Sequence, residues 1–562
     1  MPLGELRFLL FYTITICAKF MQTNIFGEPH SNGLTIEQAA YKANVSTATI
    51  RNWIKTGYLE QAGKGLITKQ SLENFMCNVA GKEKLNARAN KHLKDSHQHE
   101  LLQNVVEKLA QEHEGEQIGI AYEKKLSESY KNQEGIYYTP SWIVKDMLAN
   151  IKIEPHYTFL DPCCGSGNFI LEALRLGIAV ENIYGFDTDE NAVFITKERI
   201  RQEFGVEASN IVVGDFLENA SAFYDKNMSF NLIFTNPPWG KKIDKSAKEK
   251  YAQMYETHKS VDTTSLFMGA CLKIISPNGL LGFLIQDAFF NIATFEDIRT
   301  KVLDKKILKL VDYGKAFKGL MTKAQAIILS NNTVEITGNI ECKNKENSFF
   351  RTQKSFQNNP KKILNFGAHQ HEAEVITQLY SVEHTTLSGK AKWALGIVTG
   401  NNQKFCKDTL TEGYAPILKG TDITKHGIKQ PTTFIPLDFS NFQQVAPLEM
   451  YLAPEKIIYK FISYDLCFYC DNQQQYVLNS VNFFIPLEIK ITNNQLTNLL
   501  NSEIINWLFN KLFATHKILR GDLELLPIHT SYFEQYSEFS EESYLQFLNL
   551  IKLPNRTFRV KN

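Results

Sequence analysis

The chain has 562 residues, 43% of them hydrophobic and 22% charged, which is enough for several domains with cores of ordinary size. Its 61 Lys and Arg residues nearly balance 60 Asp and Glu residues, so the total charge gives no support for nucleic-acid binding, which would need local basic patches. The one adjacent cysteine pair, Cys163 and Cys164, lacks CxxC spacing, and we expect a reduced, cytoplasmic protein with no zinc site.

Residues 1–30 are expected to form a poorly defined N-terminus. An apolar run from Phe8 to Cys17 follows Arg7 and could pass for a signal-peptide core. It is too short to span a bilayer, and no small-residue cleavage site follows it. We therefore expect that the true translation start lies near Met21 and that the preceding residues come from an upstream start. We expect no transmembrane segment elsewhere.

Residues 31–80 predict two short helices, the first near 34–40 and the second within 45–59. Ser46 is the expected N-cap of the second helix, and Gly57 its end. This outline resembles the winged helix-turn-helix modules of MerR and excisionase type, although such modules also dock proteins. The resemblance implies that the second helix enters a major groove through Thr47, Thr49, Arg51 and Asn52.

Residues 81–116 are expected to form a charged helical arm, since apolar residues recur there at a spacing near 3.6. Its histidines are more typical of a solvated helix face than of a metal site. They are His92, His97, His99 and His113.

The core begins at residue 117, and its first motifs surround a glycine-rich turn. A Tyr-Thr-Pro sequence precedes a helix expected over 141–151, and a short strand over 157–160 runs into Asp161 and two glycines. Glycines at Gly165 and Gly167 let a backbone approach a ligand closely at a helix N-terminus. No Lys-Ser/Thr follows these glycines, which argues against a P-loop, and Asp161 favours a positively charged ligand.

Three further strands end in polar side chains. The strand 183–186 is followed by Asp187, 26 residues after Asp161, where a carboxylate commonly accepts hydrogen bonds from both ribose hydroxyls. The strand 211–213 precedes Asp215, which could accept from a base amino group, and Phe216, which could cover the ring. The strand 230–235 runs into Asn236-Pro237-Pro238-Trp239. We expect all four strand ends at one edge of an open sheet.

These motifs, in this order, resemble the gamma class of S-adenosylmethionine-dependent amino-methyltransferases, the TaqI-like and type I modification-subunit group. The resemblance implies an α/β fold, with a Rossmann-like methyltransferase sheet over 117–335, a helical N-terminal module and a mixed α+β target-recognition domain. It assigns Tyr138 and Thr139 to the methionine part of S-adenosyl-L-methionine, Asp161 and Gly165 to its amino-acid end, Asp187 to the ribose, and Asp215 with Phe216 to the adenine. The cofactor-binding residues expected in total are Tyr138, Thr139, Pro140, Asp161, Cys163, Gly165, Gly167, Asp187, Asp215 and Phe216.

The Asn-Pro-Pro-Trp sequence fits the activation of an exocyclic amine. Such an amine is a poor nucleophile because its lone pair is delocalised into the ring, and the Asn236 side-chain oxygen and the Pro237 carbonyl are acceptors that could draw it toward sp³ geometry. Trp239 could stack on a base flipped out of a duplex. In the family, an aromatic residue just before the last strand stacks on the other face of the flipped base. Phe317 has the matching spacing, although an aromatic residue packed in the core would have it too. The expected catalytic set is Asn236, Pro237, Pro238, Trp239 and Phe317.

The sheet is expected to finish with an apolar strand over 279–285 and an antiparallel hairpin ending in the strand 324–329. Residues 336–385 are polar and irregular, so we expect a linker. The triplet Glu341-Cys342-Lys343 lacks an upstream acid on a paired strand, and no nuclease site is expected there.

Residues 386–562 alternate short strands with polar turns and resemble the TaqI-like specificity domain, which implies a module facing a DNA groove. Candidate DNA contacts are Lys404, Lys419, Lys460 and Arg520.

The sequence therefore predicts a site-specific DNA adenine-N6 methyltransferase that uses S-adenosyl-L-methionine and no metal, and acts on double-stranded DNA. A separate cognate restriction endonuclease is a candidate partner, and no membrane is expected. Methylation of cytosine N4, of RNA or of a protein glutamine uses the same motif and stays open. A DNA-binding regulator with a vestigial methyltransferase fold is the alternative from another class.

Overall fold

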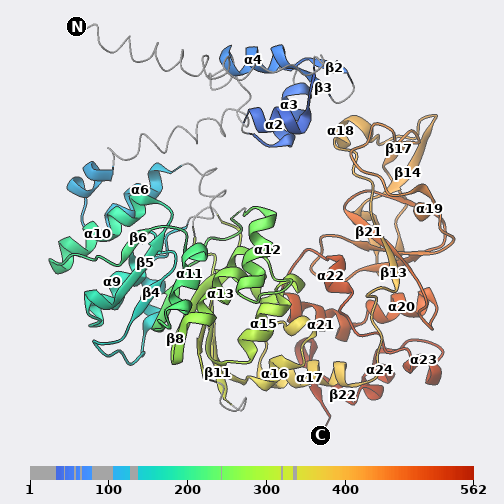
Figure 1. Cartoon of the computed structure of the whole chain (residues 1–562). Helices are drawn as coiled ribbons and strands as arrows, with labels where there is room; N and C mark the ends of the chain where they lie inside the picture. The colour runs from blue at the N-terminus through green and yellow to red at the C-terminus, as the bar shows by residue number, and fades with distance from the viewer. Residues whose placement is uncertain are drawn as a thin grey trace. The chain divides into compact units, whose positions relative to one another are not determined.

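The computed structural model describes residues 33–43, 45–55, 59–63, 66–78, 106–126, 137–241, 243–317, 320–332 and 338–561 (Figure 1). The chain divides into two compact units, Met1–Val105 and Val106–Asn562. The expectations for residues 1–30 and for Gly57, His92, His97 and His99 lie outside the described residues.

The first unit contains both predicted helices and a small sheet. Thr35 caps the first helix by accepting from the Gln38 amide at 3.2 Å, and the Ser46 hydroxyl accepts from the Thr49 amide at 3.1 Å, as predicted. The strands order β1-β3-β2 and pair antiparallel, and the sheet was not expected from the sequence. Trp53 is fully buried in the core. The elements are β1 (Gly33–Thr35), α2 (Ile36–Lys42), α3 (Thr47–Lys55), β2 (Gln61–Gly63), β3 (Leu66–Thr68) and α4 (Lys69–Asn78).

A nine-stranded sheet forms the centre of the second unit, in the order β12-β11-β9-β10-β8-β7-β4-β5-β6. The strands β6, β5, β4, β7 and β8 are parallel, and β10 runs antiparallel between β8 and β9. The predicted Rossmann-like sheet and its closing hairpin are therefore confirmed. The strands are β4 (Phe159–Asp161), β5 (Ile183–Asp187), β6 (Ile211–Val213), β7 (Phe230–Thr235), β8 (Ile275–Gln286), β9 (Lys306–Gly314) and β10 (Ala324–Ser330).

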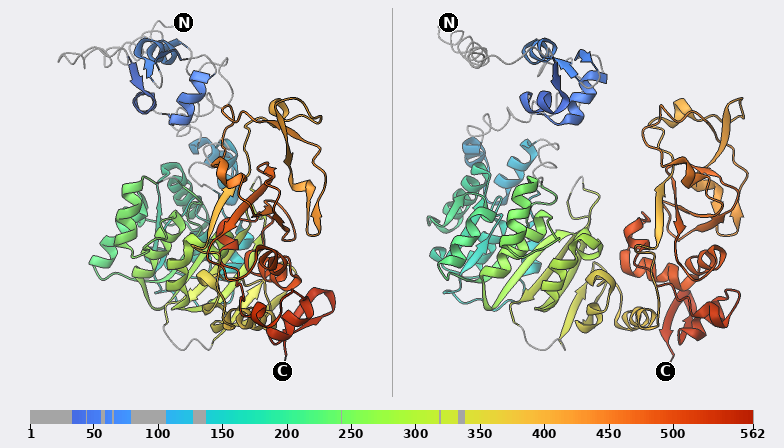
Figure 2. Two further views of the ribbon diagram at one scale, coloured as in Figure 1. Left: turned by 90° about the vertical axis from the view of Figure 1, so that its right-hand side faces the viewer. Right: turned by 45° about the vertical axis from the view of Figure 1, so that its right-hand side comes forward.

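Helices cover both faces of this sheet (Figure 2). Successive strand residues face opposite sides, so Phe159 and Leu160 of β4 belong to two different hydrophobic cores. One core takes residues from α8, α9 and α10, and the other from α11, α13 and α15. The helices are α6 (Glu116–Lys125), α8 (Ser141–Leu148), α9 (Asn168–Arg175), α10 (Glu190–Phe204), α11 (Phe216–Asp225), α12 (Lys245–Met254), α13 (Thr263–Ile274), α14 (Ala288–Asn291) and α15 (Glu296–Leu303).

The prediction that residues 336–385 form a linker is wrong, because the described part of this segment is folded. It extends the central sheet through β11 (Asn339–Lys343), parallel to β9, and β12 (Ser348–Thr352), and continues into α16 (Lys354–Gln357) and α17 (Gln370–Ser381). Ile340 and Cys342 are buried while Glu341 and Lys343 face the other side, where Lys343 Nζ lies 2.6 Å from the Asp146 carboxylate. The segment looks irregular in sequence because half of each strand is polar.

The C-terminal part is mixed α+β, as predicted. One sheet orders β13-β21-β18-β19, a smaller one β17-β14-β20, and helices follow. Its main elements are β13 (Ala391–Leu395), β14 (Tyr414–Leu418), β17 (Phe434–Pro436), β18 (Lys456–Lys460), β19 (Phe468–Asp471), β20 (Tyr476–Val477), β21 (Val481–Pro486), α20 (Asn493–Leu500), α21 (Glu503–Phe513), α22 (Arg520–Leu523), α23 (Tyr532–Gln535), α24 (Glu541–Phe547), β22 (Leu550–Leu553) and β23 (Thr557–Val560).

Two asparagine side chains from the preceding part of the chain donate hydrogen bonds to backbone carbonyls of this C-terminal part. Asn291 donates to the Phe513 carbonyl at 3.0 Å, and Asn365 donates to the Lys511 carbonyl at 3.2 Å. Within the described part of the chain, no helix is long and apolar enough to cross a membrane.

Candidate functional site

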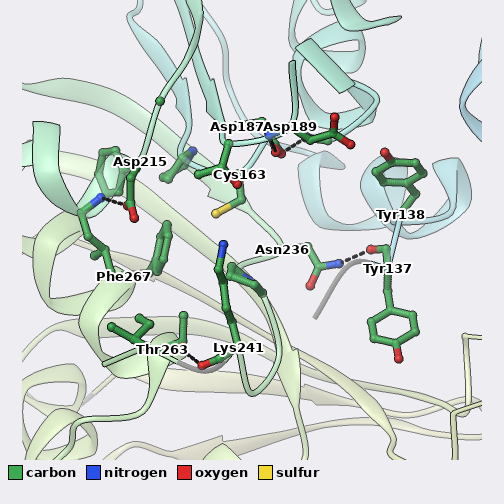
Figure 3. A pocket seen from close by; sticks show the side chains of 18 residues that line it. Tyr137, Tyr138, Cys163, Asp187, Asp189, Asp215, Asn236, Lys241, Thr263 and Phe267 are labelled. Atoms are coloured by element: carbon green, nitrogen blue, oxygen red, sulfur yellow. Dashed lines mark hydrogen bonds between the residues drawn. The ribbon is translucent and has the colours of Figure 1, made fainter. Parts of the chain in front are cut away.

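A pocket opens at the carboxyl ends of β4, β5, β6 and β7, where the predicted motifs meet (Figure 3). A smaller pocket adjoins it and shares Tyr137, Tyr138, Cys163, Gly165 and Asn236 with it. The larger pocket is lined by Tyr137, Tyr138, Pro162, Cys163, Gly165, Asp187, Thr188, Asp189, Gly214, Asp215, Phe216, Leu217, Asn236, Pro238, Lys241, Ile243, Thr263 and Phe267.

The glycine turn is fixed by the carboxylate of the next strand. The Gly165 amide donates to Asp187 Oδ2 at 2.9 Å, and the φ of Gly165 is 52°, in the left-handed region. A Cβ there would lie 2.9 Å from the Tyr138 ring, so only glycine fits. Gly167 does not line either pocket. It is the N-cap of α9 with a φ of 87°, and a Cβ would lie 2.7 Å from Thr196 behind the turn.

Two carboxylates on this edge have raised pKa values. Asp161 is 1% exposed and accepts from the Thr235 hydroxyl at 2.7 Å and from the Cys163 amide at 3.1 Å. Burial raises the pKa of Asp161 to about 7 and that of Asp187 to about 6. Asp161 lines the smaller pocket and Asp187 the larger, as the predicted division between amino-acid end and ribose requires.

The far end of the larger pocket has aromatic walls. Asp215 caps α11, its Oδ1 accepting from the Leu217 amide at 2.8 Å. The Phe216 ring stacks on Phe267 of α13, with ring centroids 5.7 Å apart and 26° between the planes. Phe267 was not predicted from the sequence, because an apolar residue within an apolar helix carries no signal of a binding role.

The Tyr-Thr-Pro segment closes the other end. Tyr138 Oη is buried and has no hydrogen-bond partner among the described residues, and burial raises the pKa of Tyr138 well above its usual value. Beside it, the Tyr122 hydroxyl of α6 donates to Asp189 Oδ2 at 2.7 Å, a contact that the sequence did not reveal. The Thr139 carbonyl accepts from the Asn168 side chain at 2.6 Å. Pro140 is the N-cap of α8 and lines neither pocket.

Asn236 stands where the two pockets join. Its Nδ2 donates to the Tyr137 carbonyl at 2.8 Å, which fixes the side-chain amide (Figure 3). Its Oδ1 is buried and accepts from no group in the part of the chain that the structure describes. Pro238 lines the larger pocket, whereas Pro237 is buried beneath the loop. The loop therefore presents one oriented, unused acceptor to the cavity.

Trp239 and Phe317 lie together but outside the pocket lining. Their ring centroids are 5.1 Å apart at an interplanar angle of 87°, and Tyr137 contacts both. Trp239 is 8% exposed and Phe317 is 6% exposed, within the same hydrophobic core. Core packing thus describes Phe317 in this conformation, and stacking of either ring on a base stays a prediction.

Lys241 and Thr263 also line the pocket and were not predicted from the sequence, whereas Cys163 was. The Lys241 side chain points into the pocket, and its charge lowers the pKa of Asp187, opposing the larger effect of burial (Figure 3). The Lys241 carbonyl accepts from the Thr263 hydroxyl at 3.0 Å. Burial raises the pKa of Cys163 well above its usual value, so the thiol in the pocket is held protonated and is a poor nucleophile.

The residues described form no cluster of three or more potential metal ligands. The chain does contain one CxxC spacing, Cys467 to Cys470, which the sequence analysis did not consider. Both lie at or beside β19, where residues three apart face opposite sides of a strand.

The candidate DNA contacts of the C-terminal part lie outside both pockets. Lys404 Nζ lies 4.9 Å from the centre of the Phe405 ring. Arg520 Nε donates to Glu524 at 2.8 Å, and its guanidinium lies 5.8 Å from the Trp393 ring.

Two family models match the chain. One described as N-6 DNA Methylase matches residues 113–399, and one described as TaqI-like C-terminal specificity domain matches residues 415–528. Type II methyltransferase M.VspI of Vibrio sp. (strain 343) is 44% identical over 409 residues, which is 72% of this chain and 100% of that protein. Type II methyltransferase M.BanIII of Aneurinibacillus aneurinilyticus is 27% identical over 221 residues, 34% of this chain and 38% of that protein.

Among solved structures, the chain resembles the one titled "cryoEM structure DrdV-DNA complex", with a TM-score of 0.50 and 13% sequence identity. The match covers 89% of this chain and 70% of that one. At this identity the likeness concerns the fold alone.

Proposed function

Because this chain belongs to the N-6 DNA methylase family, we propose that its pocket binds S-adenosyl-L-methionine and that the Asn236–Trp239 loop receives the target adenine. The chain is a DNA methyltransferase that acts on adenine N6, as predicted, and S-adenosyl-L-methionine is its methyl donor. The residues that carry out these steps are the proposal.

The observation that carries the proposal is the unpaired Asn236 Oδ1. A buried carbonyl oxygen without a donor costs about 1–3 kcal/mol, and an exocyclic amine placed at this loop would supply the missing N–H. The Tyr137 carbonyl holds the amide in the orientation that turns Oδ1 to the cavity. With the Pro237 carbonyl as a second acceptor, the loop would align the amine lone pair with the methyl group.

The pocket fits the cofactor in charge and shape. S-adenosyl-L-methionine supplies an electrophilic methyl group, and it carries positive charge on its sulfonium and on its α-ammonium group. Asp161 would face the α-ammonium group at the amino-acid end, Asp187 would accept from the ribose, and Phe216 with Phe267 would enclose the adenine. Tyr138 and Gly165 would confine the methionine part, since their close approach leaves no room for a side chain on the turn.

We further propose that the target adenine is flipped out of double-stranded DNA. A base stacked in a duplex cannot reach the Asn236 side chain, and extrusion costs a few kcal/mol. Trp239 and Phe317 would separate to admit the base between them, because their present edge-to-face contact leaves no space for it. Stacking would return roughly 1–3 kcal/mol.

We propose a restriction-modification setting in the cytoplasm. The 44% identical relative is named a Type II methyltransferase, and the C-terminal part matches the TaqI-like specificity model. On this proposal the DNA sequence is read by the C-terminal part, and a separate endonuclease cuts the unmethylated site.

The test is transfer of labelled methyl groups from S-adenosyl-L-methionine to duplex DNA, followed by nucleoside analysis. Asn236→Ala should lower kcat about 100-fold or more while the cofactor still binds, because the amide acts on the amine. Asn182→Ala is the matched control, since its amide also donates to a backbone carbonyl, Pro155 O at 3.3 Å, away from the pocket.

Equal methyl transfer by Asn236→Ala would contradict the proposed role of the loop. Label recovered as N4-methylcytosine, or in RNA or protein, would contradict the substrate. A DNA footprint without methyl transfer to any DNA would favour the regulator with a vestigial fold.

A further inference from the structure

The hairpin between β18 and β19 ends in an exposed apolar tip. Tyr464 is 78% exposed and Ile462 is 64% exposed. Leu519, on the neighbouring loop between α21 and α22, is 39% exposed. Large apolar side chains grouped on a surface commonly mark an interaction site.

The tip is rigid. The Ile518 amide donates to the Phe461 carbonyl at 2.9 Å, and the Ser463 amide donates to the His516 carbonyl at 3.0 Å, so the two loops are paired. The Tyr464 ring lies against the His516 ring, with centroids 4.3 Å apart. A side chain held in this way loses little conformational entropy when it enters a partner.

Basic residues flank the tip. Lys517 and Arg520 are exposed, and Lys460 immediately precedes the hairpin turn. The nearby carboxylates are both engaged, Asp465 by the Asn506 side chain at 2.9 Å and Glu524 by Arg520. An exposed aromatic ring among cations matches nucleic acid, which offers stacked bases and phosphates together.

The tip is attached beside the edge of the sheet that carries the active loop. Asn291, shortly after β8, donates to the Phe513 carbonyl, and Ala514 lines a cavity of about 380 Å³ together with Asp287, the residue after β8. β8 pairs with β7, whose end leads into Asn236. His516 follows Ala514 by two residues, at most about 7 Å of extended chain.

We propose that Tyr464, supported by Ile462, enters the DNA duplex at the step that the target adenine leaves and occupies the gap in the base stack. The proposal rests on the proposed function, and it names the element of this chain that holds the duplex open. Unstacking is the unfavourable part of base flipping, and an inserted aromatic or aliphatic side chain offsets it.

The test uses the full chain and a duplex containing the adenine that the wild-type enzyme methylates, located first by mapping modified plasmid DNA. Tyr464→Ala should lower kcat/KM for this duplex roughly 5- to 100-fold, and Tyr464→Phe should retain it. With 2-aminopurine at the target position, the fluorescence rise on binding should be lost in Tyr464→Ala. Phe350→Ala is the matched control, because Phe350 is 64% exposed on β12.

A rescue separates wedge insertion from general weakening. A target adenine opposite an abasic site is already poorly stacked, so Tyr464→Ala should methylate it within a fewfold of wild type. Cofactor affinity should stay unchanged. Lys517→Ala should instead weaken binding of all duplexes alike and reduce the salt dependence.

Normal kcat/KM and normal 2-aminopurine fluorescence in Tyr464→Ala would overturn this proposal, as would a change in self-association alone, which would make the tip a contact between copies. Failure of the wild-type enzyme to methylate DNA would instead overturn the proposed function, so the two failures are distinct.

Discussion

Asp161 and Asp187 keep their protons to a higher pH than exposed aspartates, because burial disfavours the charged carboxylate. The charge of Asp187 also raises the pKa of Asp161, and the charge of Asp189 raises the pKa of Asp187. A cationic ligand reverses this balance by favouring the ionised forms. We therefore expect cofactor binding in this pocket to be coupled to proton release.

Cofactor affinity should increase as the pH rises through the window from about 6 to about 7, where these two carboxylates ionise. At pH 5.5 the affinity should be at least about 10-fold weaker than at pH 8. Titration calorimetry in buffers of different ionisation enthalpy should record proton release at pH 6.5. The stability of the empty protein should change in the opposite direction, because folded pKa values above the unfolded value of about 3.9 make ionisation unfavourable as the pH rises.

Asp161→Asn should flatten much of this pH dependence, whereas Asp225→Asn, on the exposed end of α11, should leave it intact. An affinity independent of pH between 5.5 and 8 would show that the ionised forms of these two carboxylates do not contribute to cofactor binding.

The residues recovered from the sequence share one property. Asp161, Asp187, Asp215 and Asn236 are polar groups at the ends of apolar strands, and that combination is readable without coordinates. Phe267 reaches the same pocket from α13, and Tyr122 of α6 contacts Asp189 of its lining; both lie on helices whose apolar residues also serve the core. Their role depends on how the helices pack, which periodicity does not encode.

At the scale of elements, β11 and β12 show why a polar stretch was mistaken for a linker. Arg351 of β12 is 1% exposed, and its guanidinium donates to the Asn365 carbonyl at 2.8 Å, to the Asn365 side chain at 3.0 Å and to the Ser355 hydroxyl at 2.7 Å. It also stacks 3.8 Å over Phe356. An arginine in a polar run is expected at the surface. Here the buried guanidinium instead ties the edge strand β12 to the residues that follow it.

Arg351→Met should destabilise the second unit by about 3 kcal/mol, since it leaves without a donor the buried oxygen atoms that now accept hydrogen bonds from the guanidinium. Chemical denaturation followed by tryptophan fluorescence would measure the loss. Arg201→Met, at an exposed ion pair with Glu198, should change the stability by less than about 0.5 kcal/mol. Equal effects of the two substitutions would mean that β12 is dispensable for the fold.

The helix α6 is a second element that the sequence placed only loosely. Gly119 lies so close to the glycine turn that a Cβ would stand 2.6 Å from Ser166 Oγ, and Tyr122 reaches Asp189 from the same helix. The sequence marked residue 117 as the start of the catalytic domain but gave no sign that this helix packs against residues of the pocket lining. Such contacts join residues more than 40 positions apart.

At the scale of the whole molecule, the pocket and the N-terminal unit are separate in the chain. All residues that line the two pockets fall between Tyr137 and Phe267, and the unit boundary lies at Val105. The two family models cover 113–399 and 415–528, so neither extends into the first unit. The helices α2 and α3 with their small sheet therefore lie outside both the pocket lining and the residues that the family models match.

A chain beginning at Val106 should bind the cofactor with unchanged affinity and keep its kcat, because it retains every pocket residue. We expect its KM for duplex DNA to rise and the salt dependence of binding to become shallower, by about one unit of slope for each phosphate contact removed. The reason is the proposed role of α3 in a major groove, where Arg51 is exposed. Arg51→Ala in the full chain should reproduce part of the loss. If the shortened chain matches the full chain in KM and in salt slope, the N-terminal unit does not read DNA, and docking of a protein becomes its expected role. If the affinity for the cofactor falls instead, the first unit supports the pocket.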